Sequence, residues 1–462
     1  MSIFAVESTI KELLKSQDQF LKTASKTSVE NRISILKKLK ACIKAYEQDI
    51  VDAIYKDFQK PEFEVLTTEL FVVYKELNLF IKNLKKWSKP KSVSSAWLNF
   101  PSSDKIHYVP WGKVLVIAPW NYPFQLAITP AIGAIACGNT VVLKPSEHAP
   151  HTANILKKIF NEVFDEQQGK VITGAVDTAK ILLEQKWNYV FFTGSVPVGR
   201  IVSEQIAKYM TPHTLELGGK NPCIVDSTAK IDIAARRICW GKFLNAGQTC
   251  IAPDYLMVDS KIRDEFQEKL ISTLKEFYSE NSYRDYTRLI HDAHFEKLTG
   301  FLKNLNIIYG GEYDAKTNFL APTLVDSPNL SSPLMEEEIF GPILPIYSYS
   351  SFDELEEMIT SFEKPLSLYV FSESKDFAEQ VNETFEFGGG VINDTIVHFV
   401  NDKLPFGGVG DSGVGNYHGR ASFDTFTRRK PIVYRKTWLD IPIKYPPYTR
   451  VDTFKSFLNL FR

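Results

Sequence analysis

Short apolar runs alternate with helical periodicity between residues 113 and 217, and this alternation constrains the fold more than any other feature of the sequence. Each run has the length and composition of a buried strand and is separated from the next by a helical stretch. The strands are predicted at 113–118, 140–144, 170–173, 188–193 and 213–217. Five strands separated by helices predict a parallel sheet with helices on both of its faces.

The alternation resumes after residue 220 with longer helices, which predicts a second α/β domain. The helices of this domain are expected at 231–243 and 261–278, and its strands at 255–258, 323–325, 366–371 and 390–393. Residues 1–87 carry apolar side chains at helical spacing and predict a helical layer that covers another element. Residues 90–109 contain Lys-Pro, several serines and few apolar repeats, which is typical of an excursion or linker.

Charge and cysteine content exclude several classes of protein. The 462 residues include 54 basic and 55 acidic side chains, and so balanced a charge gives no general attraction for nucleic acid. The five cysteines are odd in number and lack C-x-x-C spacing, which argues against structural zinc and a disulfide framework, so no metal is predicted. A cytoplasmic location fits this cysteine usage, and no run approaches the roughly 20 apolar residues of a transmembrane segment.

A carboxylate and a thiol stand near the expected boundary of the two domains, each close to glycine. Glu216 begins the sequence Glu-Leu-Gly-Gly-Lys, and Cys250 ends the sequence Gly-Gln-Thr-Cys. Glycine lets the backbone approach a ligand closely. Cys250 is therefore a candidate nucleophile and Glu216 a candidate base. The alternative for Cys250 is a small buried apolar residue, which is the commoner role of a lone cysteine.

Two segments at strand ends can hold a dinucleotide. Gly194 and Ser195 leave a predicted strand and Gly199 follows in the helix, whose N-terminus favours a phosphate. Because the segment is not G-x-G-x-x-G, an ordinary strand–turn–helix explains it equally well. Lys144 and Glu147 lie at the end of the second strand and can hold ribose hydroxyls, although a solvated loop accounts for them as readily.

Three further segments are candidates for a site. Asn121 lies in a turn between two prolines after the first strand, where its amide can donate to an oxyanion or cap the next helix. Glu338 ends a run of three acids that leads directly into Ile-Phe-Gly-Pro, so it is expected to turn toward the interior rather than join a solvated face. Residues 404–413 repeat glycine around Phe406, which favours a packed loop over a flexible linker.

Together these segments closely resemble the NAD(P)-dependent aldehyde dehydrogenase superfamily, in the order of that family and over nearly the whole chain. The resemblance rests on seven motifs, at 119–121, 144–147, 192–195, 216–220, 247–250, 338–342 and 405–408. Within the superfamily, residues 250–255 and 417–426 look like class 3, the group of fatty and aromatic aldehyde dehydrogenases.

The resemblance implies an α/β fold with a Rossmann-like parallel-sheet NAD(P)-binding domain, an α/β catalytic domain and a small β oligomerisation arm. The NAD(P)-binding domain would comprise residues 1–87 and 108–217, and the catalytic domain residues 218–397. The arm would comprise residues 88–107 and 398–445. Because such arms usually join two subunits, a homodimer is expected.

The resemblance also implies residue roles. Cys250 would attack the aldehyde as a thiolate, Asn121 and the Cys250 backbone N–H would hold the oxyanion, and Glu216 would activate the water that hydrolyses the thioester. Glu338 would hold the nicotinamide ribose, with a share in the base role as the alternative. The rest of the cofactor site would be the pyrophosphate-binding Ser195 and Trp120, the ribose-binding Lys144 and Glu147, and Gly194, Gly199 and Phe340.

NAD is the expected cofactor, because an acid such as Glu147 repels the 2′-phosphate of NADP, but class 3 relatives tolerate both, so NADP stays open. The expected substrate is a medium- or long-chain aliphatic, isoprenoid or aromatic aldehyde. One alternative is a CoA-acylating semialdehyde dehydrogenase, which needs no base at Glu216. A cysteine hydrolase would need a histidine near Cys250. A catalytically silent relative would be expected to lack Cys250, Asn121 or Glu216.

The C-terminal tail, residues 446–462, differs from that of the membrane-bound fatty aldehyde dehydrogenases, which carry a spanning helix there. Residues 454–462 are apolar and basic, so peripheral contact with a lipid surface, or covering of the substrate entrance, is one expectation. Packing on a partner subunit is the favoured alternative.

Overall fold

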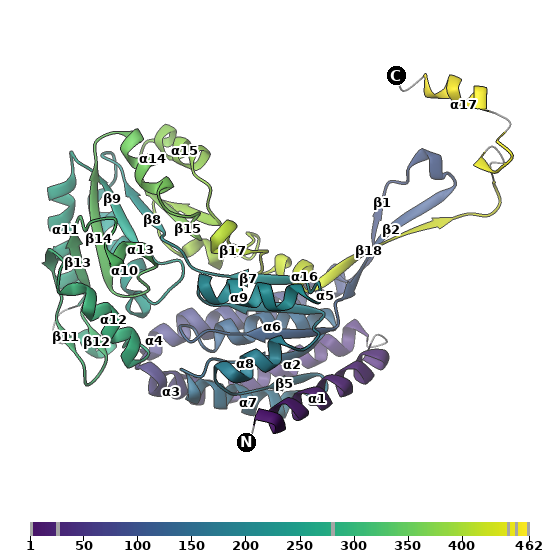
Figure 1. The fold of residues 1–462 in the computed structure, drawn as a ribbon, viewed down its shortest axis with the longest axis horizontal. Helices are drawn as coiled ribbons and strands as arrows, with labels where there is room; N and C mark the ends of the chain where they lie inside the picture. The colour runs from purple at the N-terminus through teal and green to yellow at the C-terminus, as the bar shows by residue number, and fades with distance from the viewer. Residues whose placement is uncertain (1–2, 25–27, 279–281, 441–443, 449–450, 460–462) are drawn as a thin grey trace. The chain divides into compact units, whose positions relative to one another are not determined.

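The structure is a computed structural model that describes residues 3–24, 28–278, 282–440, 444–448 and 451–459. The chain forms two compact units (Figure 1). The main unit comprises Met1–Trp87 and Pro110–Thr427, and the small unit comprises Ser88–Val109 and Arg428–Arg462. Among the described helices, none combines the length and the hydrophobicity that crossing a bilayer requires.

The first sheet of the main unit has six strands. Their order across the sheet is β17 (Gly413–Val414), β7 (His213–Glu216), β6 (Tyr189–Thr193), β3 (Lys113–Ile117), β4 (Thr140–Lys144) and β5 (Gly169–Val171). All neighbours are parallel except β17, which pairs antiparallel with β7. The strand order reverses between β3 and β6, and ligands of such open sheets bind beyond the carboxyl ends at this point.

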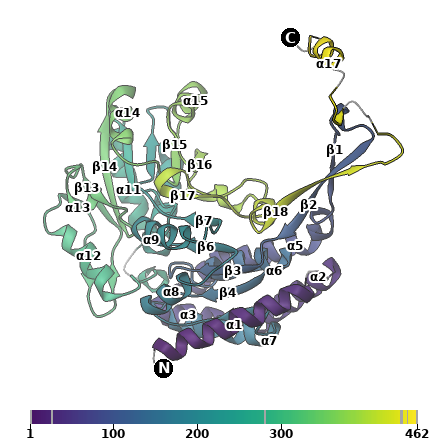
Figure 2. The ribbon, with the colours of Figure 1, turned by 45° about the vertical axis from the view of Figure 1, so that its right-hand side comes forward.

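Helices cover both faces of the first sheet (Figures 1 and 2). One face carries α1 (Ile3–Ala24), α8 (Val176–Leu183) and α9 (Val196–Ala207). The other face carries α6 (Gln125–Cys137) and α7 (Pro150–Val163), and outside them lie α2 (Val29–Ala45), α3 (Glu47–Phe58) and α5 (Phe71–Trp87). Every residue of α6 is buried, because this helix lies between the sheet and the outer layer and is apolar on all sides.

The second sheet of the main unit has seven strands. Their order is β10 (Ile307–Tyr309), β13 (Thr323–Asp326), β14 (Ile343–Tyr349), β9 (Tyr255–Asp259), β8 (Pro222–Val225), β15 (Ser367–Phe371) and β16 (Gly389–Ile392). Only β10 is antiparallel to its neighbour. The other helices and strands of this half are β11 (Tyr313–Asp314), β12 (Phe319–Leu320), α10 (Ile231–Phe243), α11 (Arg263–Phe277), α12 (Asp292–Leu302), α13 (Pro333–Glu336), α14 (Phe352–Thr360) and α15 (Lys375–Thr384), whereas α16 (Arg420–Thr425) packs on α6 of the first half.

The small unit is a three-stranded sheet with a short helix. It contains β1 (Lys91–Val93), β2 (Ser102–Pro110), β18 (Thr427–Arg435) and α17 (Val451–Leu458). Phe100 and Trp438 pack edge to face at 6.2 Å, and the Lys436 N–H donates to the Pro101 carbonyl at 2.9 Å. The excursion expected at residues 90–109 is therefore an ordered hairpin rather than a linker.

The α/β fold predicted from the sequence is confirmed. Every strand predicted in the two domains is present, with its ends within two residues of the expected positions. The predictions missed β8 and β14, each of which contains a proline, a residue that argues against a strand in a sequence, and they also missed the short strands β10, β11, β12 and β17. The domain boundaries, the homodimer and the role of the tail stay predictions, and tail residues 449–450 and 460–462 lie outside the described residues.

A buried ion pair lies in the segment between α3 and α5 of the outer helical layer. Lys60 lies before α4 (Glu62–Val65), and Glu69 lies in the π-helical segment η1 (Leu66–Leu70) that connects α4 to α5. The Lys60 ammonium is 2.9 Å from a Glu69 carboxylate oxygen, and both side chains are completely buried. The same ammonium lies 3.9 Å from the centroid of the Tyr122 ring.

Lys60→Met is expected to lower the free energy of unfolding by about 3–5 kcal/mol, because the Glu69 charge is then buried without a counter-charge. Urea unfolding followed by circular dichroism measures this loss. Lys85→Met is the matched control, since Lys85 pairs with Glu30 on the exposed surface, and we expect it to change the unfolding midpoint little. Equal midpoints for the two variants would contradict the prediction.

Candidate active site

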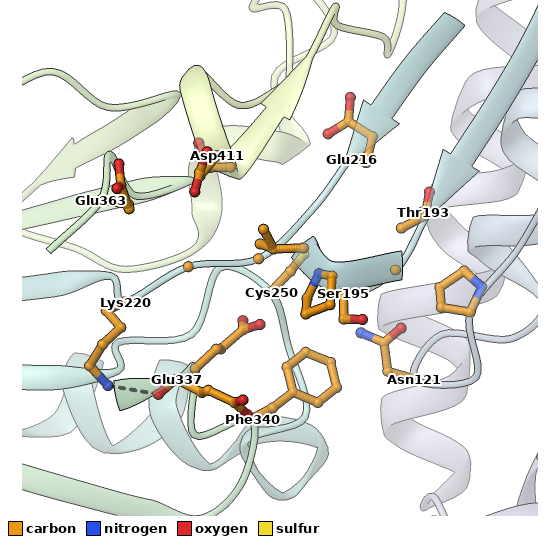
Figure 3. Close-up of a pocket in the computed structure, with 18 of the residues that line it drawn as sticks. Asn121, Thr193, Ser195, Glu216, Lys220, Cys250, Glu337, Phe340, Glu363 and Asp411 are labelled. Carbon is orange, nitrogen blue, oxygen red and sulfur yellow. Dashed lines mark hydrogen bonds between the residues drawn. The ribbon is translucent and has the colours of Figure 1, made fainter. Parts of the chain in front are cut away.

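A cavity of about 560 Å³ opens beyond the carboxyl ends of β3, β6 and β7 (Figure 3). It lies at the point where the strand order of the first sheet reverses. Of the candidate site residues, its lining includes Trp120, Asn121, Gly194, Ser195, Glu216, Cys250, Glu338 and Phe340. The sequence motifs that lie far apart along the chain thus meet around one space.

A left-handed turn brings Cys250 into this cavity. Asn245, Ala246 and Gly247 have φ of 56°, 52° and 73° in the short helical segment η3 (Leu244–Gly247). Gly247 also lies so close to the Gly341 carbonyl that a Cβ would overlap it. The Cys250 thiol is free and half-buried. Burial, followed by the charges of Glu338 and Glu216, raises the pKa of this thiol.

Glu216 ends β7 and is 3% exposed. Neither of its carboxylate oxygens has a hydrogen-bond partner among the described residues. Because burial disfavours the charged form, the pKa of Glu216 is raised well above its ordinary value. A buried carboxyl without partners costs stability and is a recognised mark of a functional site.

The Asn121 amide is held against the loop of Cys250. Its Nδ2 donates to the Gln248 backbone carbonyl at 3.0 Å, and the backbone carbonyl of Asn121 accepts from Asn245 Nδ2 at 2.9 Å. An amide nitrogen carries two hydrogens, and the bond to Gln248 uses one of them. The second N–H is available for an oxygen atom bound in the cavity that Asn121 lines.

The N-terminus of α9 forms another part of the lining. Ser195 is the N-cap residue, and its hydroxyl makes no capping hydrogen bond. The first backbone N–H groups of a helix point outward and carry partial positive charge, so they bind phosphate. Gly194 lies against the Phe192 ring, where a Cβ would clash. The residues present therefore fit the pyrophosphate of a dinucleotide.

Glu338 comes from a loop of the second half of the main unit. Its carboxyl lies so close to Gly218 that a Cβ there would overlap it, and burial raises its pKa well above the ordinary value. Phe340 has a φ of 51° and packs edge to face on Trp120 at 5.3 Å. The inward position of Glu338, rather than a solvated acidic face, agrees with the sequence analysis.

Three candidate cofactor residues lie outside the lining of this cavity. Lys144 and Glu147 form an ion pair of 2.6 Å beyond the end of β4. Gly199 lies in the first turn of α9, where a Cβ would clash with Leu217. The reason for glycine at position 199 is therefore close packing of helix on strand.

A second cavity, of about 370 Å³, is lined mainly by apolar side chains. It includes Phe63, Trp240, Leu244, Ile396 and Phe399, and it ends at Thr193, Glu216 and Cys250, which line the first cavity as well. The sequence analysis missed Thr193, a buried threonine whose hydroxyl has no partner among the described residues. Thr193 is the last residue of β6 and immediately precedes Gly194. This position at the carboxyl end of a parallel strand is the sequence feature that could have predicted its place in the site.

The sequence analysis also missed His294. His294 lines the first cavity, and its Nε2 lies 2.9 Å from the Phe340 carbonyl. No motif marks it in the sequence. Asp411 and Ser412 line the cavity from the glycine-rich loop, in which Phe406 is buried and pairs with Tyr417. The repeated glycines of residues 404–413 had predicted a packed loop, and the buried Phe406 agrees with that prediction.

Comparison with known proteins decides the family. The aldehyde dehydrogenase family profile matches residues 5–432. The chain belongs to the aldehyde dehydrogenase family. As a member of this family it is an oxidoreductase that oxidises aldehydes, and enzymes of the family use NAD or NADP.

Individual aldehyde dehydrogenases are similar over nearly the whole chain. The chain is 46% identical to the 4,4'-diaponeurosporen-aldehyde dehydrogenase of Staphylococcus aureus, over 93% of this chain and 94% of that protein. It is 42% identical to aldehyde dehydrogenase family 3 member A2 of Pongo abelii, over 92% of this chain and 89% of the relative. The structure of Staphylococcus aureus AldH in a substrate-bound state has a TM-score of 0.95 and 44% identity, covering 98% of this chain and 99% of the other. The resemblance to class 3 enzymes is therefore confirmed.

Proposed function

We propose that this aldehyde dehydrogenase oxidises a medium- or long-chain aliphatic, isoprenoid or aromatic aldehyde to its carboxylic acid through a covalent intermediate on Cys250. One observation carries the proposal. The apolar cavity and the cavity with the helix N-terminus share Thr193, Glu216 and Cys250. An aldehyde that enters the apolar cavity and a dinucleotide in the other cavity would therefore meet at the thiol.

In the first step Cys250 attacks the aldehyde carbon as a thiolate. Because burial and the nearby carboxylates raise the pKa of the thiol, it needs a base to take its proton. Cavity water takes this proton and passes it to solvent, which leaves the Glu216 carboxylate free to act later on the hydrolytic water. The free N–H of Asn121 and the backbone N–H of Cys250 then stabilise the oxyanion of the thiohemiacetal.

Collapse of the oxyanion leaves a thioester on Cys250. The nicotinamide, when bound, supplies the acceptor for the hydride that leaves the former aldehyde carbon. Glu216 next takes a proton from a water molecule that attacks the thioester carbonyl, and the carboxylic acid and the free thiol are released. Glu338 is the alternative base, because its carboxyl also lines the cavity and also has a raised pKa.

The cofactor preference that we propose is NAD, with NADP accepted. Ser195 and the N-terminus of α9 would bind the pyrophosphate, and Trp120 and Phe340 would line the path to the nicotinamide. Glu147 carries its charge beyond β4, where it would face the ribose of the adenosine and repel a 2′-phosphate. Lys144 holds that carboxylate and partly offsets the repulsion.

The CoA-acylating alternative is less well supported. A thioester that passes to CoA needs no base for water, yet Glu216 lies at the junction of the two cavities with both carboxylate oxygens free of partners among the described residues.

A chain-length series tests the proposed function. Reduced-nicotinamide absorbance is followed with straight-chain, isoprenoid and aromatic aldehydes, with each cofactor and with or without CoA. We expect kcat/KM to rise by up to about fourfold for each methylene that the apolar cavity buries, at about 0.8 kcal/mol per methylene. Silence with every aldehyde, or turnover only with CoA, would contradict the proposal.

A further inference from the structure

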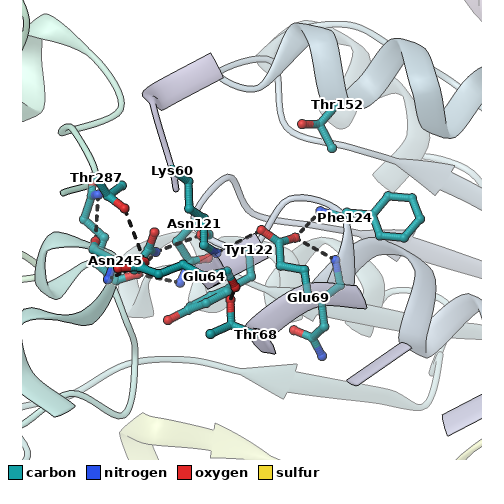
Figure 4. Close-up of polar contacts among 12 residues, drawn as sticks. Lys60, Glu64, Thr68, Glu69, Asn121, Tyr122, Phe124, Thr152, Asn245 and Thr287 are labelled. Atoms are coloured by element: carbon teal, nitrogen blue, oxygen red, sulfur yellow. Dashed lines mark hydrogen bonds and ion pairs between the residues drawn. The ribbon is translucent and has the colours of Figure 1, made fainter. Parts of the chain in front are cut away.

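The outer helical layer contains a π-helical turn beside the candidate active site. In η1 (Leu66–Leu70) the Phe71 N–H donates to the Leu66 carbonyl, five residues back. Residues five apart face nearly the same side of a π-helix, whereas in an α-helix they are about 140° apart. Glu64 lies in α4, two residues before the π-helical turn, and Glu69 lies within the turn. The two are five apart, and Figure 4 shows both carboxylates directed at loops of the active site.

Glu64 contacts the left-handed turn that precedes Cys250. One of its carboxylate oxygens accepts from the Asn245 backbone N–H at 3.0 Å and from the Thr287 hydroxyl at 3.3 Å. Asn245 has a φ of 56°, which costs energy for a residue other than glycine and persists only where its surroundings hold it. The bond from Glu64 supplies part of that constraint.

Asn245 passes this constraint to the proposed oxyanion site. Its side-chain amide donates to the Asn121 carbonyl at 2.9 Å and to the Gln248 carbonyl at 3.2 Å. The Gln248 carbonyl also accepts the bond from the Asn121 amide. The Asn245 turn therefore sets the position of Asn121. It also sets the course of the backbone from Gln248 to Cys250, which is two residues after Gln248.

Glu69 holds the other end of the Asn121 turn. Its second carboxylate oxygen accepts from the backbone N–H groups of Phe124 and Gln125, at 2.9 and 3.1 Å. These groups begin α6, which has no cap from its own N-cap side chain. Lys60 neutralises the Glu69 carboxylate from the opposite side.

We propose that Glu64 is a positioning residue for aldehyde oxidation, which holds the Asn245 turn so that Asn121 and the Cys250 backbone N–H meet the oxyanion together. This inference rests on the proposed function, because the oxyanion roles are part of it. Glu64 lines neither cavity, so it would touch neither substrate nor cofactor. Its effect is therefore on the rate of the first chemical step and not on binding.

The decisive comparison is Glu64→Met against Glu64→Gln. Both replacements have nearly the length of glutamate, but only glutamine keeps an oxygen that accepts from Asn245. We expect Glu64→Met to slow the single-turnover formation of reduced nicotinamide by roughly ten- to a hundredfold, because misplacement of a catalytic group by about 1 Å can cost about a hundredfold in rate. Glu64→Gln is expected to stay within about threefold of the parent.

Single-turnover kinetics separate this role from a structural one. Enzyme is mixed in excess over a medium-chain aldehyde, and the rate constant for formation of reduced nicotinamide is measured. Only folded, active molecules set this rate constant, whereas unfolded molecules lower the fraction of enzyme that reacts. Burial raises the pKa of Glu64 to about 7, so removal of the charge is not expected to destabilise Glu64→Gln at pH 8. Glu62→Gln is the matched control, because Glu62 is exposed on the same short helix, and it is expected to match the parent.

A double-mutant cycle completes the test. If Glu64 acts through Asn121, Glu64→Met is expected to add less than twofold to the loss caused by Asn121→Ala. A parent-like rate constant in Glu64→Met, or fully additive losses, would overturn the inference while leaving the proposed function intact. If Asn121→Ala itself is as fast as the parent, the proposed oxyanion role is wrong and the inference falls with it. Glu64→Ala replaces Glu64→Met if the latter does not fold.

Discussion

Cys250→Ala is expected to lower kcat/KM for aldehyde oxidation by at least about 10⁴-fold, because no other group can form the thiohemiacetal and the thioester. Cys250 is the described cysteine that lines both cavities, and its half-buried thiol faces their junction. Cofactor binding is expected to persist, since the helix N-terminus at Ser195 and the aromatic pair Trp120 and Phe340 are unchanged. Steady-state assays measure the loss of oxidation, and quenching of protein fluorescence by NADH measures cofactor binding in the same variant.

Cys42→Ala is the matched control for this variant. Cys42 is buried in α2 and lines neither cavity, so its loss is expected to leave kcat/KM unchanged. Residual oxidation in Cys250→Ala above one per cent of the parent rate would refute a covalent mechanism on this thiol. Equal losses in both variants would point instead to a general effect on folding.

Glu216→Gln is expected to give one rapid burst of reduced nicotinamide followed by a steady rate about 10²–10⁴-fold below that of the parent. The amide can neither take a proton from water nor release the thioester, so the acyl group stays on Cys250. Rapid mixing measures the burst, and mass spectrometry of the quenched protein detects the acyl adduct. Glu338→Gln is the comparison variant, because Glu338 is the other carboxyl of raised pKa in the cavity.

The stability of Glu216→Gln serves as its control. An acid whose pKa is raised in the folded state stabilises the fold least at high pH, because ionisation is easier in the unfolded chain. The contribution of Glu216 is complete below the ordinary pKa of glutamate and declines as the pH rises toward its raised value. Glu216→Gln is therefore expected to melt at or above the parent temperature at pH 8. If this variant turns over normally and Glu338→Gln shows the burst, Glu338 is the base.

The fold and most of the candidate site follow from local patterns in the chain. Alternating strands and helices predicted the first sheet, and the rule that parallel strands share one carboxyl edge brought Asn121, Ser195 and Glu216 together. The glycine-rich loop was correctly expected to pack. By contrast, β8 and β14 were missed because their prolines disguise buried parallel strands.

Contacts between distant segments were beyond sequence analysis. Glu64 and Asn245 are separated by 181 positions, and neither stands in a motif that names the other. Gly199 looked like part of a phosphate loop, but its close contact with Leu217 makes it a packing position. His294 and Thr193 gained their places in the cavity only through the chain's folding around the sheet.

Residue order along this chain was enough to reveal its family, its two α/β halves and its candidate nucleophile and base, because strand periodicity and short motifs are local properties. Tertiary structure alone revealed that two cavities meet at Cys250 and Glu216, and that a π-helical turn directs two carboxylates at the loops behind them. These features were not predictable from the sequence because they arise where segments that are remote in sequence pack together. Such packing removes carboxyl groups from water, leaves buried polar atoms without hydrogen-bond partners and holds residues in left-handed backbone conformations.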